Sequence, residues 1–455
     1  MKFSLAELAP VLEAHLEGED LDVVRVSTDT RQIEAGDLFI ALRGERFDAH
    51  AFVAEAQQKG AAAAVVDHSL PLEMPQLVVA DTRLALGRIA QYHRDSFTGT
   101  LVAITGSSGK TSVKEMLASI LAGAGPTLAT RGNLNNDIGV PLTLFRLEPG
   151  HRYAVIEMGA SGPHEIDYMT RLARPDVAIL NNAMGAHLEG FGSLEGVVRA
   201  KGEIFNGLSD EGIAVVNADD PHAEVWLAQL SGRKVLRFGL ERDDVEVTAR
   251  NLFRQDNGCY GFDLEIGGQA EPVRLQVLGR HNVANALAAA AAAHAAGLAP
   301  GQIAVGLGRF EAVPGRMKPL VGPGGCRLID DSYNANPGSV KAAIDMLADM
   351  PGARALVLGD MAELGTGAAA QHAGIGRHAA EQGIESLFGL GPLSGEAVEA
   401  YKAAGGRDAV AFRDREHLIN HLKGLLHDDL TLLVKGSRSA AMEKVIEGLL
   451  DEDTH

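Results

Sequence analysis

The chain has 455 residues, of which 46% are hydrophobic and 22% charged, so it is long enough for about three domains with sizeable cores. A formal net charge of −19 argues against general binding to nucleic acid or anionic membranes, so an anionic ligand needs a local group of cations and helix N-termini. Two widely separated cysteines, no recognisable signal peptide and no apolar run of about 20 residues predict a cytoplasmic protein without membrane insertion.

Residues 1–80 alternate short apolar runs with polar turns, a pattern typical of a small α/β domain. Strands are expected at 23–26, 37–42, 61–66 and 77–79, and a helix at 49–59. Two loops at strand ends, 27–31 and 41–50, gather hydroxyl groups, arginines and a glycine. Such loops can bind a diphosphate, but taken alone they are more often solvated turns.

A phosphate-binding loop is the clearest motif of the chain. The apolar strand 101–105 leads into Gly106-Ser107-Ser108-Gly109-Lys110-Thr111-Ser112, and a helix is expected from about Val113. The glycines let backbone N–H groups turn toward phosphate oxygens, Lys110 can reach the β/γ-phosphates, and the Thr111 hydroxyl can hold Mg²⁺. Ile104 replaces the first glycine of the general template, which leaves the shorter G-x-x-G-K-T form. The flanking strand and helix favour nucleotide binding over an ordinary turn.

From Asp81 to Val313 long helices alternate with strands, which predicts a mostly parallel sheet covered on both faces. Strands are expected at 153–158, 177–180 and 213–216. Ligands bind at the C-terminal ends of such strands, where Glu157 could offer an oxygen to Mg²⁺. His187 and Lys201 follow the next strand and could approach the same site, although each taken singly is more often structural or solvated.

Beyond Asp219 the hydrophobic period shifts toward two, which predicts an antiparallel addition to the sheet. Its strands are expected at 245–250, 259–266 and 273–278, with turns at 256–258 and 267–268. An alanine-rich helix over 284–296 follows, opened by 279–282. Amides at this helix start, Asn282 and Asn285, can read the edge of a base.

A third unit begins near Pro314, where proline and glycine mark a hinge. Strands are expected at 327–329, 355–358, 386–390 and 430–434, and helices at 339–349 and 372–382. This is again a doubly wound α/β pattern. Polar clusters at 330–337, 359–365 and 435–439 lie at its strand ends, where a ligand cleft forms.

Taken together, the motifs resemble those of the Mur ligases, ATP-dependent amide-forming enzymes of peptidoglycan assembly. The family-wide motifs are T-G-S-S-G-K-T (105–111), E-M-G (157–159), A-H-L-E (186–189), A-K-G-E-I-F (200–205), G-R-H-N-x-x-N (279–285) and P-G-R (314–316). Four others are most similar to the members that use D-alanyl-D-alanine: G-N-L-N-N-D-I-G-V-P (132–141), I-D-D-S-Y-N-A-N-P (329–337), G-D-M-x-E-L-G (359–365) and K-G-S-R-S (435–439).

The resemblance implies an α/β protein of three domains: a small N-terminal α/β UDP-binding domain (1–80), a central P-loop mononucleotide-binding parallel sheet with an antiparallel addition (81–313), and a C-terminal Rossmann-like domain (314–455). It also implies a monomer that joins D-alanyl-D-alanine (D-Ala-D-Ala) to UDP-N-acetylmuramoyl-tripeptide (UDP-MurNAc-tripeptide) through an acyl phosphate. ATP and two Mg²⁺ ions would be required.

The residue roles are likewise implied by the resemblance. ATP would contact Gly106, Ser107, Ser108, Gly109, Lys110, Thr111, Ser112, Asn282, Arg316 and Asp331. Thr111 and Glu157 would hold one Mg²⁺, and His187 with a carbamylated Lys201 the second; Lys110, Glu157, His187 and Lys201 are the expected catalytic residues. The UDP-linked substrate would contact Ser27, Thr30, Arg31, Gly44, His50, Asn135 and Asn136. Departures at Ala51, Ser161, His164 and 366–367 weaken the expected substrate contacts but not the reaction.

Three alternatives remain at this stage. One is another Mur ligase. A folylpolyglutamate-synthase-like amide ligase shares the phosphate loop and the lysine, but it lacks a dedicated UDP-binding first domain. A non-catalytic nucleotide switch would leave Arg316, Asp331 and Lys435 without a purpose.

Overall fold

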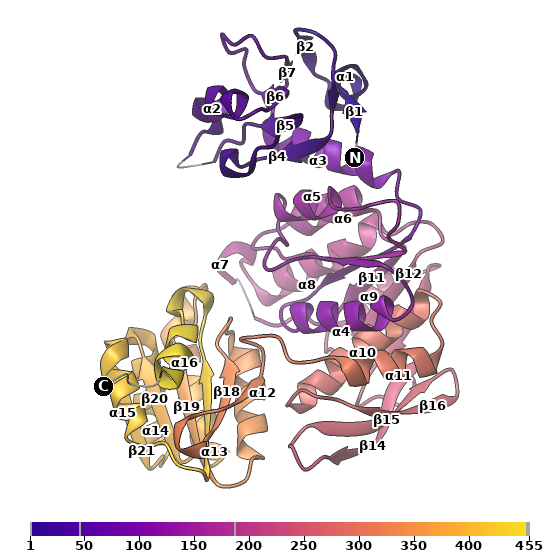
Figure 1. Cartoon of the computed structure of the whole chain (residues 1–455). Helices are drawn as coiled ribbons and strands as arrows, with labels where there is room; N and C mark the ends of the chain where they lie inside the picture. Colours follow the sequence, from indigo (N-terminus) through magenta and orange to yellow (C-terminus); the bar gives the residue numbers. More distant parts are fainter. Residues whose placement is uncertain (1, 45–46, 186–187, 452–455) are drawn as a thin grey trace.

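The computed structural model describes residues 2–44, 47–185 and 188–451, which form three α/β units in chain order (Figure 1). The first unit contains β1 (Phe3–Ser4), α1 (Leu5–Leu12), β2 (His15–Glu17), β3 (Asp22–Val23), β4 (Arg25–Ser27), β5 (Asp37–Ile40), α2 (Val53–Gln58), β6 (Ala63–Val66) and β7 (Gln76–Val78). Its main sheet has the order β2-β7-β6-β5-β4, with β2 antiparallel and the other neighbours parallel. The parallel strands place the loops that follow β4 and β5 at one edge.

Helix α3 (Thr82–Arg94) joins the first unit to the second. Asp81 caps it by accepting hydrogen bonds from the backbone N–H groups of Arg83 and Leu84. Its buried face is shared, because Leu86 and Ile89 belong to the core of the first unit while Ala90 packs into the core of the second. The boundary between residues 80 and 81, placed at the start of this helix, stays a prediction.

The central unit is built on a nine-stranded sheet of order β16-β15-β14-β13-β12-β11-β8-β10-β9. Its strands are β8 (Thr100–Thr105), β9 (Thr127–Ala129), β10 (Tyr153–Glu157), β11 (Val177–Leu180), β12 (Ile213–Asn217), β13 (Lys234–Phe238), β14 (Val247–Arg254), β15 (Tyr260–Ile266) and β16 (Gln269–Arg274). Its helices are α4 (Lys110–Ala122), α5 (Gly139–Leu144), α6 (Glu165–Ala173), α7 (Leu188–Phe191), α8 (Leu194–Gly202), α9 (Ala223–Gln229), α10 (Arg280–Ala295) and α11 (Pro300–Arg309). In the order of the sheet, every pair of neighbouring strands from β9 through β10, β8, β11, β12 and β13 to β14 is parallel. The pairs β14–β15 and β15–β16 are antiparallel and form the predicted addition.

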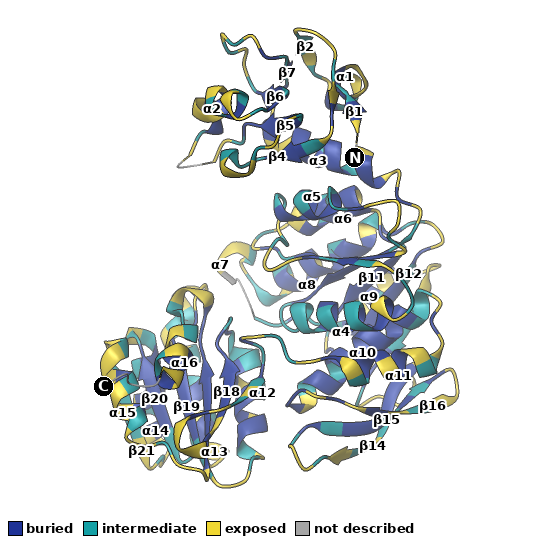
Figure 2. Ribbon diagram, viewed as in Figure 1, coloured by how far each residue is buried: buried dark blue, intermediate teal, exposed yellow. Residues whose placement is uncertain are grey.

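Helices cover both faces of this sheet, and the strands β8, β10 and β11 between them are almost entirely buried (Figure 2). Helix α10 packs with α4 and α11 on one face. Its alanines at 286 and 288–293 are buried in that core, where small side chains let the helices approach closely. The phosphate-loop helix α4 is therefore held between the sheet and α10.

Two sequence predictions in this unit are wrong in position. Helix α4 starts at Lys110 rather than near Val113, because the loop turns at Gly109 and the helix begins with the next residue. The last antiparallel strand covers Gln269–Arg274 rather than 273–278, because the turn at Gly267 and Gly268 is tight and pairing resumes at once between Ile266 and Gln269. The buried apolar residues Leu275 and Val277 lie beyond the strand and pack into the core.

The third unit has a six-stranded sheet of order β17-β18-β22-β19-β20-β21, parallel except for β17. Its strands are β17 (Lys318–Val321), β18 (Arg327–Asp331), β19 (Ala353–Gly359), β20 (Ser386–Leu390), β21 (Asp408–Phe412) and β22 (Leu430–Lys435). Its helices are α12 (Pro337–Ala348), α13 (Ala368–Glu381), α14 (Pro392–Ala403), α15 (Arg415–Lys423) and α16 (Glu443–Leu450). The predicted α/β class and three-part architecture are confirmed.

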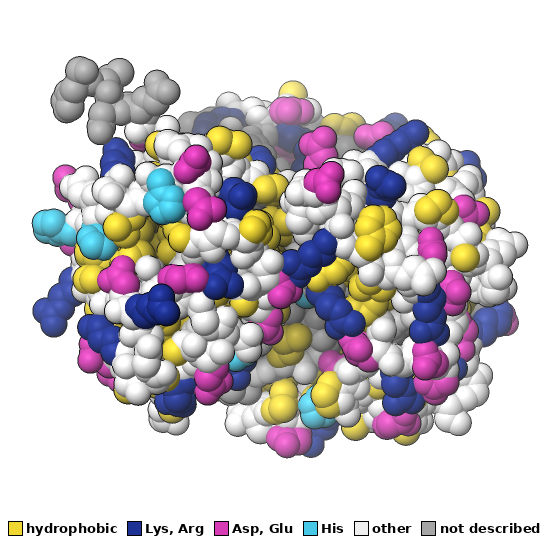
Figure 3. Space-filling view, turned by 90° about the horizontal axis from the view of Figure 1, so that it is seen from below, with side chains coloured by type: hydrophobic (Ala, Val, Ile, Leu, Met, Phe, Trp, Pro, Cys, Tyr) yellow, Lys and Arg dark blue, Asp and Glu magenta, His cyan; other side chains and the backbone are white. Residues whose placement is uncertain are grey.

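The surface seen from below carries basic and acidic side chains interspersed with one another (Figure 3). On this face the two signs of charge are mixed rather than gathered in one basic patch. Within the described part of the chain, no helix combines the length and apolar character needed to cross a bilayer.

Candidate active site

The phosphate loop joins the end of β8 to the start of α4. Gly109 adopts φ +77°, and a Cβ placed there would lie 2.4 Å from Asn285 Oδ1 and 2.7 Å from Asn181 Nδ2. Both the conformation and the lack of space require glycine at this position. The first N–H groups of α4 are thereby presented at the strand end, where a helix N-terminus attracts phosphate.

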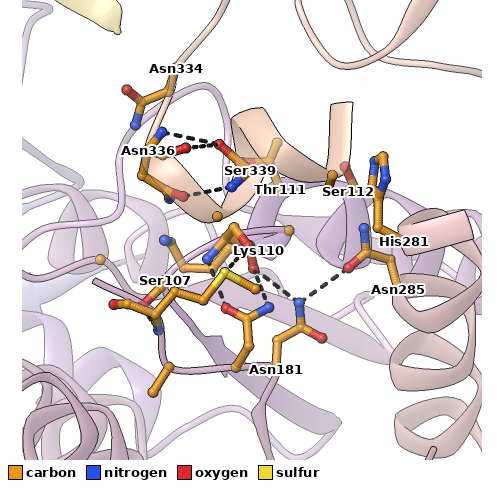
Figure 4. A pocket seen from close by; sticks show the side chains of 18 of the residues that line it. Ser107, Lys110, Thr111, Ser112, Asn181, His281, Asn285, Asn334, Asn336 and Ser339 are labelled. Carbon is orange, nitrogen blue, oxygen red and sulfur yellow. Dashed lines mark hydrogen bonds between the residues drawn. The ribbon is translucent and has the colours of Figure 1, made fainter. Parts of the chain in front are cut away.

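Asparagines from the end of β11 hold the loop in shape (Figure 4). Asn182 accepts hydrogen bonds from the backbone N–H groups of Ser107, through its carbonyl at 3.0 Å, and of Ser108, through Oδ1 at 2.9 Å. Asn181 Nδ2 donates to the Ser108 carbonyl at 3.0 Å and to Asn285 Oδ1 at 3.2 Å. The loop is thus shaped before any ligand arrives.

Lys110 lies where a lysine can neutralise phosphate charge. Its Nζ donates to the Gly106 carbonyl at 2.7 Å. Desolvation lowers the pKa of its ammonium group, the Glu157 carboxylate opposes that effect, and Arg316 adds to it. Lys110 therefore lies inside the site and is not a solvated surface lysine.

Glu157 is buried at the end of β10 and faces the start of α4. Thr111 Oγ1 donates to its Oε2 at 3.1 Å, and Asn135 Nδ2 donates to its Oε1 at 2.9 Å. A hydroxyl and a carboxylate are the hard oxygen donors that Mg²⁺ prefers. The donor set of Thr111 and Glu157 therefore fits a magnesium ion.

The third unit contributes directly to this site. Arg316 donates from its guanidinium to Thr111 Oγ1 at 2.9 Å, and its Cζ lies 4.1 Å from the Tyr333 ring centroid. Asp331 is buried; it accepts from Lys435 Nζ at 2.5 Å and from the Met317 backbone N–H at 3.2 Å. The structure thus brings Arg316 and Asp331, two residues that the resemblance assigns to the ATP site, to the cavity that Lys110 lines.

The cavity has a volume of about 740 Å³ and lies between the second and third units. Its described lining includes every phosphate-loop residue from Ser107 to Ser112, together with Asn135, Asn136, Glu157, Asn282, Arg316 and Asp331. Asn282 is buried at the start of α10, donates to the Leu278 carbonyl at 2.8 Å and accepts from Asn285 Nδ2 at 2.9 Å. Gly106 precedes this lining and accepts the Lys110 hydrogen bond.

Lys201 is buried in α8 and does not itself line the cavity. Burial, with a smaller contribution from Lys110, lowers its pKa to about 7. Its Nζ lies 5.4 Å from the Phe191 ring centroid. His187, predicted to act with it, lies outside the described residues.

The predicted UDP contacts lie at the C-terminal ends of β4 and β5, apart from the large cavity. Ser27 is buried and donates from Oγ to the Asp29 carbonyl at 3.1 Å, whereas Arg31 is exposed and pairs with Asp29. Thr30 accepts at its carbonyl from a lysine ammonium at 3.1 Å, and the Gly44 N–H donates to the Phe47 carbonyl at 2.8 Å.

The His50 side chain is buried and is not open to a ligand. Its buried ring lies between Asp48 Oδ1, 2.6 Å from Nδ1, and the Asp67 N–H, which donates to Nε2 at 3.0 Å. Both ring nitrogens are therefore engaged, so His50 holds the loop rather than offering a free donor.

Sequence reasoning missed how Asn181, Asn182 and Thr130 support the loop and Glu157. Asn181 and Asn182 follow β11 directly, so their place at a strand end was the available signal. Thr130 follows the three-residue strand β9 and accepts from the Glu157 N–H through Oγ1 at 3.0 Å. No sequence pattern marks a single threonine after so short a strand.

Comparisons with known proteins agree with this arrangement. Three family models match: "Mur ligase family, catalytic domain" over 22–94, "Mur ligase middle domain" over 104–293 and "Mur ligase, glutamate ligase domain" over 315–438. The chain is 47% identical to the UDP-N-acetylmuramoyl-tripeptide–D-alanyl-D-alanine ligase of Escherichia coli K12 and 33% identical to that of Bacillus subtilis, over 99% and 98% of each chain respectively.

Solved structures give the same result. A crystal structure of MurF from Acinetobacter baumannii matches with a TM-score of 0.93 and 36% identity over 99% of both chains. MurF ligase from Thermotoga maritima in complex with ADP matches with a TM-score of 0.85 and 27% identity, over 93% of this chain and 96% of that one. From the site geometry and from these relatives over its whole length, the chain belongs to the Mur ligase family.

Proposed function

We propose that this chain is the ligase that joins D-Ala-D-Ala to UDP-MurNAc-tripeptide, forming UDP-MurNAc-pentapeptide with release of ADP and phosphate. The contact between Arg316 and Thr111, separated by 205 positions in the chain, carries the proposal. It brings residues of two units of the protein to one phosphate site. The full-length similarity to ligases of that name supports the choice of substrates.

ATP would occupy the cavity with its phosphates over 106–112 and Lys110. Asn282 would contact the adenine, Asp331 the ribose and Arg316 the phosphates. The Thr111 hydroxyl and the Glu157 carboxylate would hold one Mg²⁺. This ion, when bound, would neutralise charge on the phosphates and on the phosphoryl group in transfer.

Lys201, with His187, would serve a second Mg²⁺ in its carbamylated form. A protonated amine cannot bind a cation, whereas a carbamate offers oxygen ligands. The lowered pKa of the buried Lys201 supports this assignment, because only the neutral amine reacts with CO₂.

The reaction is a carboxylate activation in two steps. The terminal carboxylate of the tripeptide attacks the γ-phosphorus, the bond to the ADP leaving oxygen breaks, and an acyl phosphate forms. The amine of D-Ala-D-Ala then attacks the acyl carbon, loses a proton, and phosphate leaves with the acyl C–O bond electrons. Lys110 and Arg316 lower the repulsion between the two anions of the first step, and the preformed loop orients them.

The remaining substrate contacts follow the geometry of the first unit. The loops that carry Ser27, Thr30, Arg31 and Gly44 would bind the UDP part, with His50 holding the second loop. Asn135 and Asn136, which line the cavity, would contact the sugar-peptide between the first and second units. We place the reaction in the cytoplasm and expect the protein to act as a monomer.

Phosphate release tests this proposal. Rapid release is expected only when ATP, UDP-MurNAc-tripeptide and D-Ala-D-Ala are all present, because the acyl phosphate needs the amine to turn over. Equal release without D-Ala-D-Ala would contradict a ligase and favour a nucleotide switch. Release with a folate and glutamate in their place would favour the folylpolyglutamate-synthase reaction.

A further inference from the structure

The segment 130–137, between β9 and α5, is fastened to its surroundings at several points. Lys114, buried on the phosphate-loop helix α4, donates from Nζ to the Thr130 carbonyl at 2.7 Å. The Gly159 N–H donates to the Asn135 carbonyl at 2.7 Å. Asp137 forms an ion pair with Arg83 of α3. A side chain on a segment anchored in this way has few positions available to it.

Two side chains of this segment reach Glu157. Thr130 Oγ1 accepts from the Glu157 backbone N–H at 3.0 Å, and the Asn135 amide donates to Glu157 Oε1 at 2.9 Å. Thr111 Oγ1 lies nearer to Oε2, at 3.1 Å, than to Oε1, at 3.3 Å. Both oxygens are thus within reach of Thr111, but the amide holds Oε1 and restrains the rotation of the carboxylate, which leaves Oε2 without a bond to Asn135.

The end of β10 is shaped to receive this amide. A Cβ at residue 159 would lie 3.1 Å from both Cγ and Nδ2 of Asn135, which is tighter than ordinary van der Waals contact. The Asn135 side chain thus lies directly against Gly159, two residues after the carboxylate that it contacts. A larger residue at 159 would push the amide away from Glu157.

We infer that Asn135 is a positioning residue for Glu157: its amide sets the carboxylate so that Oε2 and the Thr111 hydroxyl face a magnesium ion together. This role is separate from any contact that Asn135 makes with the sugar-peptide. It rests on the proposed function, because it takes Glu157 as the metal ligand. Groups that orient metal ligands typically contribute a factor of 10 to 100 in metal affinity.

Metal binding in the absence of UDP-peptide tests the inference, since no sugar-peptide contact is then present. Mn²⁺ replaces Mg²⁺, and its affinity for the ADP complex is measured by electron paramagnetic resonance. Asn135→Ala should weaken Mn²⁺ binding about tenfold. ADP affinity measured with chelator, and the melting temperature, should stay close to wild type, which separates positioning from a general structural defect.

Asn136→Ala is the matched control from the same segment. Asn136 also lines the cavity, but its Oδ1 accepts from the Gly139 N–H at 2.8 Å, so its loss should leave Mn²⁺ affinity unchanged. Gly159→Ala is a second variant that keeps Asn135, Glu157 and Thr111. It should weaken Mn²⁺ binding by shifting the Asn135 amide that its new Cβ would crowd.

Wild-type Mn²⁺ affinity in both Asn135→Ala and Gly159→Ala, or an equal loss in Asn136→Ala, would overturn the positioning role while leaving the proposed function standing. Failure of the wild-type protein to bind Mn²⁺ with ADP would instead contradict the proposed metal–nucleotide site, and the inference with it.

Discussion

Two charged side chains at the phosphate loop, Lys110 and Glu157, are the ones on which the proposed chemistry depends most. Lys110→Ala and Glu157→Ala should each lower turnover about a hundredfold or more, because a charge contact to the transition state is lost. Circular dichroism and the melting temperature should show that both variants still fold. Turnover like that of wild type in either folded variant would remove that residue from the site.

Lys201 separates a carbamate from a simple cation. Lys201→Ala should be nearly inactive, and a small added carboxylate should restore part of the activity by supplying oxygen ligands in the vacated space. Lys201→Arg should stay inactive although it keeps the positive charge, because a guanidinium cannot become a carbamate. Activity close to normal in Lys201→Arg would contradict the carbamate.

Among individual residues, the sequence predicted those that belong to motifs of fixed spacing. Lys110 and Thr111 follow from the glycine turn, and Glu157 from its place at a strand end. The hydrogen bond from Asn135 to Glu157 and the pair of Lys435 with Asp331 span 22 and 104 positions. Such contacts depend on how strands are ordered in the sheets, which local patterns do not encode.

Among the elements, α3 carries a titratable group in its buried face. His93 is buried, and its Nε2 lies 2.9 Å from the Leu147 carbonyl. Burial lowers the pKa of the imidazole below its ordinary value of 6.5, and the hydrogen bond to Leu147 opposes this effect only in part. Below pH 6.5 the unfolded chain takes up a proton that the folded protein does not, so protonation favours unfolding. The free energy of unfolding of wild type should therefore fall more between pH 7 and pH 5 than that of His93→Gln.

Urea unfolding at several pH values checks this prediction. Gln keeps a donor for the Leu147 carbonyl but does not titrate. His417→Gln, at a side chain that is 81% exposed, controls for the loss of a histidine. Parallel curves for wild type and His93→Gln would show that His93 does not contribute to acid sensitivity.

The elements that sequence patterns found and missed differ in how strongly they are buried. Strands β11 and β20 were predicted with their observed bounds, because both are apolar and largely buried. Strands β13, β17 and β21 were missed; each begins with a charged residue, and most of its residues are partly or fully exposed. Strand β9, of three residues, was also missed.

For the whole molecule, the chain length, the alternation of helices and strands, and the proline and glycine near Pro314 predicted three α/β units. They did not predict how the strands are ordered in each sheet or how the units contact one another. That β8 lies between β10 and β11, and that the antiparallel strands extend the same sheet, depends on long-range pairing. The contact of Arg316 with Thr111 depends in turn on how the third unit meets the second.

This contact predicts that the third unit acts as a lid. Arg316→Ala should lower kcat/KM for ATP roughly tenfold to a hundredfold, since a hydrogen bond to a charged group contributes about 1.5–3 kcal/mol. Small-angle scattering should show the protein becoming more compact with an ATP analogue and UDP-peptide than without ligands. An unchanged scattering profile under all ligand conditions would contradict closure.

The identity of the product decides whether this protein joins D-Ala-D-Ala to UDP-MurNAc-tripeptide. Purified protein is incubated with ATP, Mg²⁺, D-Ala-D-Ala and UDP-MurNAc-tripeptides that differ in their third residue, and the products are analysed by mass spectrometry. The expected product is a UDP-MurNAc-pentapeptide whose mass equals that of the tripeptide substrate plus the dipeptide minus one water, formed with one ADP per product. Addition of a single amino acid, or ATP hydrolysis without any new UDP-peptide, would contradict it.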